Sequence, residues 1–158
     1  MIEAKTFWQV LAQRPIGVSI VTAQGSDGPA GFLALSASHV TADPPSMLVS
    51  IDDRTSALAA VLHGRHFAVN YLPADARAVA DMFGGRTEAK GSDRFSAAEW
   101  EALESGAPVF KRAVAVIDCA LASTFRYASS TIAVGRVVAA RSAAGAPLMF
   151  QRGQFSAG

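Results

Sequence analysis

The chain has 158 residues and a formal net charge of +1 at pH 7; 51% of its residues are hydrophobic and 17% are charged. This length predicts a single domain, and the composition is too apolar for a disordered chain. The 14 lysines and arginines are scattered along the sequence, which excludes the basic stripe expected of a nucleic-acid-binding protein.

The first third of the sequence predicts one helix followed by extended segments. Phe7, Val10 and Leu11 fall on one helical face, and GSDG at 25–28 is a hairpin turn signal. Asp43-Pro44-Pro45 breaks the extended stretch before it. In chain order we expect a helix at about 5–13, strands at 17–23 and from Pro29, irregular extended chain at 31–41, and a buried strand at 47–51.

The remainder predicts alternating helices and strands, ending in long strands. Leu58, Val61 and Leu62 are expected to point inward from a helix that begins near Thr55. We expect helices at 55–62, 75–83 and 98–103, a polar glycine-rich loop at 84–92, and strands at 67–72, 112–125, 131–141 and 147–151, with a turn at 127–130.

Six or more strands with helices between some of them predict a mainly β fold: an antiparallel, Greek-key type barrel with peripheral helices, in one domain over 1–158. The glycines lack GxGxxG order, which disfavours a Rossmann fold. The apolar surplus indicates a buried face between subunits or a ligand pocket, although a dense β core explains part of it.

Several classes of partner and compartment are not expected. No apolar run approaches the roughly 20 residues of a membrane span, and the N-terminus does not resemble a signal peptide. The single cysteine, Cys119, excludes an intrachain disulfide and suits a reducing compartment. We therefore expect a cytoplasmic protein that binds neither membrane nor nucleic acid.

Metal and nucleophile chemistry are also not expected. His39, His63 and His66 lack the spacing of metal ligands, and we interpret them as surface or helix-end residues. There is no GxSxG elbow for a hydrolase. Cys119 lies in the apolar stretch AVIDCALAS, where a small buried strand residue is the usual interpretation.

Residues 52–56 (DDRTS) lie where a strand gives way to a helix and could form an anion site. Backbone N–H groups at a helix N-terminus, with the Thr55 and Ser56 hydroxyls, can hold a phosphate. Ordinary helix capping explains the same residues, and Asp52 and Asp53 would repel a phosphate unless they face away. Further along the chain, the loop at 84–95 offers three cations that could also bind a phosphate: Arg86, Lys90 and Arg94. The alternative is that this loop is simply solvated.

The order of these segments resembles the flavin reductase-like family of FMN-binding split barrels, which includes the small reductase components of two-component flavin monooxygenases. The resemblance runs from Phe7 to Phe155. It is carried by IGVSIVTA (16–23), GFLALSASHVTADPPSMLVSI (31–51), GRHFAVNYL (64–72), SDRFS (92–96), APVFKRAVAVIDCAL (107–121), TIAVGRV (131–137) and PLMFQRGQF (147–155).

The resemblance implies a homodimer with a flavin near the subunit interface. The cofactor is FMN, with FAD as the alternative; NAD(P)H is the co-substrate, and a flavin-dependent monooxygenase is a partner. The implied cofactor-binding residues are Leu33, Ala34, Leu35, Ser36, Ala37 and Ser38 along the ring and ribityl chain, Ile51, Asp52 and Asp53 beside it, Thr55, Ser56 and Lys90 or Arg94 at the phosphate, and the loop from Phe83 to Phe95 as a cover.

The chain departs from the family pattern at three places. Leu33 and Leu35 are aliphatic where hydroxyl residues are usual, and Asp52 stands where a neutral residue, often asparagine, is common. Ala128-Ser129-Ser130 replaces a glycine–aspartate–histidine whose histidine is implicated in nicotinamide binding. Ser130 is therefore the candidate nicotinamide residue.

The functional hypothesis is an NAD(P)H-dependent flavin oxidoreductase. Such a protein mainly orients two planar rings, so the sequence assigns no catalytic acid or base. One alternative is a flavin-binding carrier or sensor without efficient reductase activity, which the replacement at Ser130 favours. Another keeps the barrel and binds haem or a deazaflavin, but no histidine is a convincing axial haem ligand.

Overall fold

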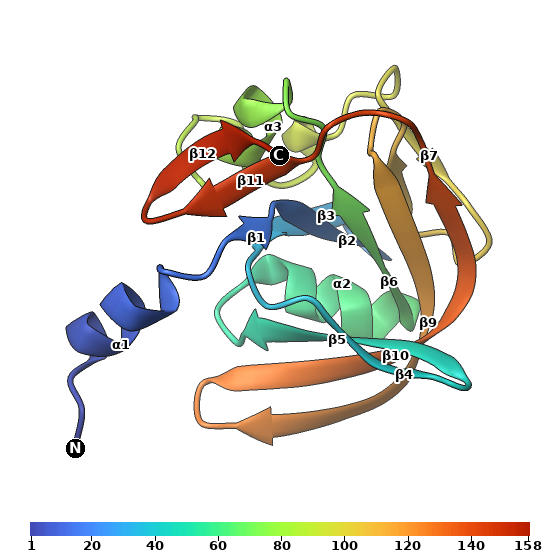
Figure 1. Ribbon diagram of the computed structural model, residues 1–158. Helices are drawn as coiled ribbons and strands as arrows, with labels where there is room; N and C mark the ends of the chain where they lie inside the picture. The colour runs from blue at the N-terminus through green and yellow to red at the C-terminus, as the bar shows by residue number, and fades with distance from the viewer.

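The computed structural model describes residues 1–158 and consists mostly of antiparallel β-strands (Figure 1). The helices are α1 (Ala4–Leu11), α2 (Ser56–Gly64), α3 (Arg77–Phe83) and a 3-10 helix, η1 (Gly91–Arg94). The strands are β1 (Ile16–Gly17), β2 (Ser19–Gly25), β3 (Gly28–Ala34), β4 (Ser38–Ala42), β5 (Pro45–Asp52), β6 (His66–Tyr71), β7 (Trp100–Ala102), β8 (Pro108–Phe110), β9 (Ala115–Tyr127), β10 (Ser130–Ser142), β11 (Leu148–Gln151) and β12 (Gln154–Ala157).

One seven-stranded sheet forms the body of the molecule, in the order β3-β2-β6-β9-β10-β5-β4. The long strands β9 and β10 join its two halves, and their register shifts at Val134/Gly135 and Val137/Ala139. Such irregularities bend a sheet, and in Figure 1 the two strands curve around α2. The result is a split barrel: β3 and β4 remain free edges, and α2 packs against β2, β3, β5 and β6.

The core contains two clusters of buried side chains. In the first, the aromatic rings of Phe83, Phe95, Trp100 and Phe110 follow one another at centroid distances of 4.8–5.5 Å. The second fills the curved sheet around Phe67. There Gly135 is required, because a Cβ at this position would lie 2.7 Å from both the Cys119 Cβ and the Phe67 ring.

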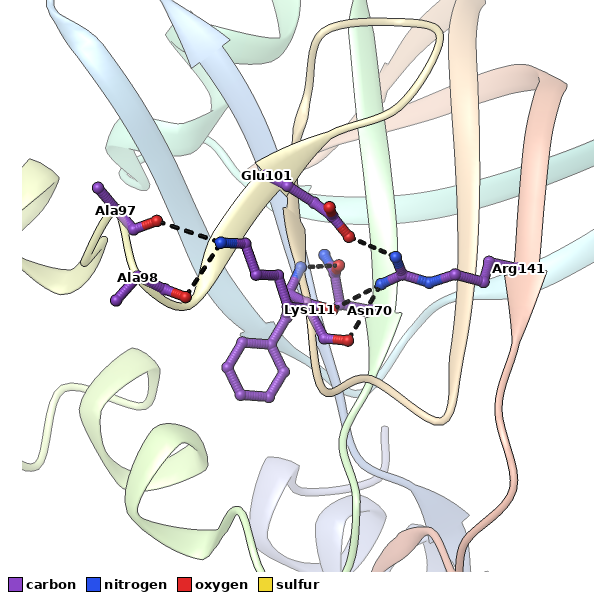
Figure 2. Close-up of polar contacts among 7 residues, drawn as sticks. Asn70, Ala97, Ala98, Glu101, Lys111 and Arg141 are labelled. Carbon is purple, nitrogen blue, oxygen red and sulfur yellow. Dashed lines mark hydrogen bonds and ion pairs between the residues drawn. The ribbon is translucent and has the colours of Figure 1, made fainter.

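Polar groups hold the small β7–β8 sheet against the large one (Figure 2). The buried Asn70 accepts a hydrogen bond from the Phe110 amide at 2.9 Å. Arg141 pairs with Glu101 and also donates to the carbonyl of Phe110 at 3.1 Å. Lys111 donates to the carbonyl of Ala98 at 3.1 Å. Strands β6, β7, β8 and β10 are therefore joined through one cluster.

The structure confirms the hairpin at 25–28, the break at Asp43-Pro44-Pro45 and the helices near 5–13, 55–62 and 75–83. The helix expected at 98–103 is wrong: β7 lies there and pairs with β8, because Trp100 enters the aromatic cluster. Strands β8 and β12 were not expected, and β4 is a regular strand within the stretch that was expected to be irregular. No helix in the chain could cross a membrane.

Two side-chain expectations are also wrong. Leu62 is 43% exposed, whereas α2 buries Ala57, Ala60 and Val61. Small residues are needed on this face, because the backbone at Gly25 comes so close that a Cβ there would lie 3.0 Å from Ala60. His66 is neither a surface nor a helix-end residue: it is buried on β6, and its Nε2 accepts a hydrogen bond from the Gln24 amide at 3.0 Å.

Candidate functional site

A cavity of about 510 Å³ lies where β3 and β5 end, a volume within the usual range of ligand sites. Much of its wall is apolar and comes from the end of β3, the end of α3 and α1. Polar groups from β5, the β5–α2 turn and the start of β10 complete it. The apolar residues are Trp8, Phe32, Leu33, Ala34, Leu35 and Phe83, and the others are Ser36, Ser50, Asp52, Thr55, Gly84 and Ser130.

The segment between β3 and β4 is fixed by two serines that use their hydroxyls within the protein. Ser36 donates to the Ser50 carbonyl at 3.1 Å and accepts from the Ser50 amide at 3.2 Å. The hydroxyl of the buried Ser19 donates to the Ala34 carbonyl at 3.2 Å. The backbone beside the cavity is therefore held in place, with Leu33 and Leu35 presenting aliphatic surface.

Asp53 ties the β5–α2 turn to the β9–β10 hairpin. Its carboxylate accepts from the Thr131 hydroxyl at 2.7 Å and from Arg126 at 2.6 Å, and its amide donates to the Ser129 carbonyl at 3.0 Å. The hydrogen bonds from Thr131 and then Arg126 lower the pKa of Asp53. Its charge therefore faces the hairpin and not the cavity.

Asp52 lines the cavity, but Arg54 pairs with its charge. The Arg54 side chain donates to the two carboxylate oxygens at 2.9 and 2.7 Å, and the Arg54 amide donates at 2.9 Å. These hydrogen bonds lower the pKa of Asp52 to about 2. Asp52 is opposite Ser130 in the β5–β10 register, so these two residues stand side by side at one end of the cavity.

Thr55 and Ser56 have different surroundings. Thr55 is the N-cap of α2, yet its side chain makes no capping hydrogen bond, and it lines the cavity. Its hydroxyl is thus free for a ligand, which argues against capping as its only role. Ser56 instead lines a separate hollow of about 250 Å³, together with Gly91 and Ser92.

The segment 83–95 reaches the cavity only at its beginning, through Phe83 at the end of α3 and through Gly84. Phe95 packs against Phe83 in the aromatic core. Arg94 donates to the Ala89 carbonyl at 3.0 Å, and its guanidinium lies 5.8 Å from the Phe83 ring centre. Lys90, Arg94 and Phe95 do not line the cavity. The side chain of Ile51 is buried in the core and does not line the cavity.

A second cavity of about 530 Å³ also borders the 34–36 segment. Ala37 and Ser38 line this cavity and not the first. Four residues line both cavities: Trp8, Ala34, Leu35 and Ser36. Trp8 was absent from the residues expected from sequence, because the apolar face of its helix resembles that of any amphipathic surface helix.

None of the three histidines lines either cavity. His66 is engaged with the Gln24 amide, and His39 and His63 are exposed. No group of three or more His, Cys, Asp or Glu side chains could hold a metal ion. The side chains that do line the first cavity suit a ligand with a flat apolar part and a polar end.

An open antiparallel barrel with such a cavity beside a strand-to-helix turn defines a ligand-binding split β-barrel. Residues 11–158 match the family model described as flavin reductase like domain, and the chain belongs to this family.

Named relatives and solved structures agree with this membership. The FMN reductase (NADH) RutF of Bradyrhizobium diazoefficiens is 40% identical over 77% of this chain and 67% of its own. The Pantoea ananatis protein of the same name is 31% identical over 89% and 73%. The structure of the NADH:FAD oxidoreductase SgcE6 of Streptomyces globisporus superposes with a TM-score of 0.87 at 29% identity, covering 98% of this chain and 95% of its own. BorF, the flavin reductase component of a bacterial two-component tryptophan halogenase, gives 0.89 at 27%, with 98% of both chains covered.

Proposed function

We propose that this protein is an NAD(P)H-dependent flavin reductase that binds FMN, or alternatively FAD, in the first cavity. The observation that carries the proposal is the division of that cavity into an apolar wall and a polar end. Phe32, Leu33 and Leu35 suit an isoalloxazine ring, and Thr55 at the start of α2 suits a phosphate. The names of the relatives, which are FMN reductases using NADH, support the same activity.

The chemistry of the residues that line the cavity suits a flavin. The backbone beside Leu33 and Leu35 is held by Ser19 and Ser36, so the ring site is formed in advance. The Thr55 hydroxyl has no capping role, and Arg54 pairs with the Asp52 charge that would otherwise repel a phosphate. A bound flavin supplies the capacity to accept two electrons from a reduced nicotinamide and to pass them on.

The protein's contribution to this chemistry is to bind and orient. Leu33 and Leu35 give the cavity an apolar wall, and Ser130 stands at its polar end beside Asp52. Ser130 can donate one hydrogen bond to a nicotinamide carboxamide. Ser130 lacks the ring and the possible positive charge of the histidine that is usual at this position. We therefore expect a high KM for NADH or NADPH.

The proposal is tested by adding NADH, then NADPH, anaerobically to the protein with bound FMN and following the flavin absorbance band near roughly 450 nm. Loss of the band at a rate that saturates with nicotinamide supports the reductase. A protein that binds FMN but bleaches with neither nicotinamide is instead a flavin carrier or sensor, the second candidate, which Ser130 favours.

We further propose that the protein acts as a homodimer and supplies reduced flavin to a monooxygenase in the cytoplasm. All five residues of β4 are exposed, as are Phe125 (53%) and Tyr127 (79%) on the β9–β10 hairpin. Such surface fits a second copy burying more than about 1,200 Å². Sedimentation that shows a flavin-loaded monomer at micromolar concentration would contradict the proposed homodimer.

The oxygenase partner is supported by neighbours such as nitrilotriacetate monooxygenase component B, at a TM-score of 0.86 and 26% identity.

A further inference from the structure

Trp8 occupies an unusual position for a tryptophan. It is 57% exposed, and it lines both large cavities. Its helix, α1, buries none of its residues and extends away from the sheets (Figure 1). Tryptophan is highly buried on average, so an exposed indole at the edge of a ligand cavity points to a binding role.

The orientation of Trp8 is set by the segment that follows α1. The Arg152 amide donates to the Ala12 carbonyl at 2.9 Å, and the Gln151 side chain donates to the Gln13 carbonyl at 2.7 Å. These hydrogen bonds attach the end of α1 to the β11–β12 hairpin. Trp8, Leu11 and Ala12 lie on one helical face and share a small hollow with Leu35, so this face is turned toward the 33–38 segment.

The chemistry of the first cavity suggests what Trp8 contacts there. Leu33 and Leu35 offer no side-chain hydrogen bonds, so a ring beside them is held by apolar contact and by stacking. Phe83 is buried in the wall of the cavity, whereas Trp8 stands at its exposed edge. The flat, electron-rich indole stacks favourably on a flat, electron-poor ring.

We propose that Trp8 covers the isoalloxazine ring of the flavin at the open side of the first cavity; this inference rests on the proposed function. Trp8 is then a determinant of affinity for the ring, while Thr55 is a determinant of affinity for the phosphate. The two ends of the ligand are recognised by separate residues, so their contributions can be measured separately.

The experiment compares Trp8→Ala, Trp8→Phe and, as a matched control, Val10→Ala, each titrated with FMN and with riboflavin. Val10 is on the same helix, is 67% exposed and lines none of the cavities described. Loss of the stacked indole should raise both dissociation constants about fivefold to tenfold. Trp8→Phe should fall between wild type and Trp8→Ala, and Val10→Ala should change neither constant by more than about twofold.

A second readout depends on direct contact. An indole stacked on a flavin quenches flavin emission, so bound FMN should be dimmer in wild type than in Trp8→Phe. Trp100 is the other tryptophan and lies in the core, so it is unchanged in both proteins.

Several results would overturn the inference. If Trp8→Ala binds FMN and riboflavin as tightly as the wild-type protein does, the inference is wrong. It is also wrong if the variant loses affinity for FMN but not for riboflavin. A loss that accompanies dissociation into monomers, measured by sedimentation, means that Trp8 acts through assembly and not on the ring. Failure of the wild-type protein to bind any flavin overturns the proposed function as well, which distinguishes the two failures.

Discussion

Replacing Thr55 by alanine tests the proposed orientation of the flavin. The Thr55 side chain lines the first cavity and makes no capping hydrogen bond to α2. Its removal should therefore leave the fold nearly as stable as before, while a phosphate at this turn loses one hydrogen bond. A hydrogen bond to a charged group contributes about 1.5–3 kcal/mol, so the FMN dissociation constant should rise roughly tenfold to 150-fold.

The assay is a fluorescence titration with FMN and with riboflavin, which has the same ring and no phosphate. Riboflavin affinity should not change. Ser56→Ala is the matched control, because Ser56 is adjacent in sequence and lines a different hollow; it should alter FMN affinity by less than about twofold. Equal losses for FMN and riboflavin in Thr55→Ala would mean that the hydroxyl supports the fold. An unchanged FMN affinity would place the phosphate elsewhere.

Three further outcomes are expected. Asn70→Leu removes three hydrogen bonds and leaves the Phe110 amide without its acceptor, so it should lower the free energy of unfolding by about 3–5 kcal/mol in urea titrations; a loss under about 1 kcal/mol would contradict the role of Asn70. Ser130→His should lower the KM for NADH without changing the FMN dissociation constant, and the reverse pattern would separate Ser130 from the nicotinamide. Burial, and then the Asp118 charge, raise the pKa of Cys119 to about 12, so its alkylation at pH 8 should proceed only as fast as unfolding; immediate modification of the native protein would refute this.

Local chemistry accounts for the parts of the fold that could be predicted from sequence. Gly28 has a φ of +111° at the end of the 25–28 turn, a conformation that glycine tolerates, and the two-residue hairpin follows. The helix expected at 98–103 was wrong for a non-local reason. Trp100 and Leu103 have helical spacing, but the partner strand β8 and the aromatic ring of Phe110 decide the structure there.

The candidate site depended more heavily on the family resemblance. Leu33, Asp52, Thr55, Phe83 and Ser130 come from separate segments, and no spacing rule brings them to one cavity. The residues expected at the ring, at the turn and at the nicotinamide nevertheless line one cavity, and their roles stay predictions. The phosphate roles of Lys90 and Arg94 stay predictions, because neither side chain lines that cavity.

Trp8 could not be predicted from its own segment. Its helix has the pattern of any amphipathic surface helix, and the proposed role of Trp8 depends on where the helix is directed. That direction is set by hydrogen bonds from Gln151 and Arg152, near the other end of the chain.

The carboxylate of Asp53 links two parts of the chain that are distant in sequence, because its hydrogen-bond donors Arg126 and Thr131 lie 73 and 78 residues further along. One part is the turn that carries Thr55, and the other is the hairpin whose exposed Phe125 and Tyr127 lie on the surface proposed for a second copy. If a second subunit of the proposed homodimer immobilises the hairpin, this link should also immobilise the turn. Thermodynamic reciprocity then requires bound FMN to strengthen the association by the same factor. Dilution of the protein should therefore weaken FMN binding. Bound FMN should in turn keep the protein dimeric at concentrations where the FMN-free protein dissociates into monomers.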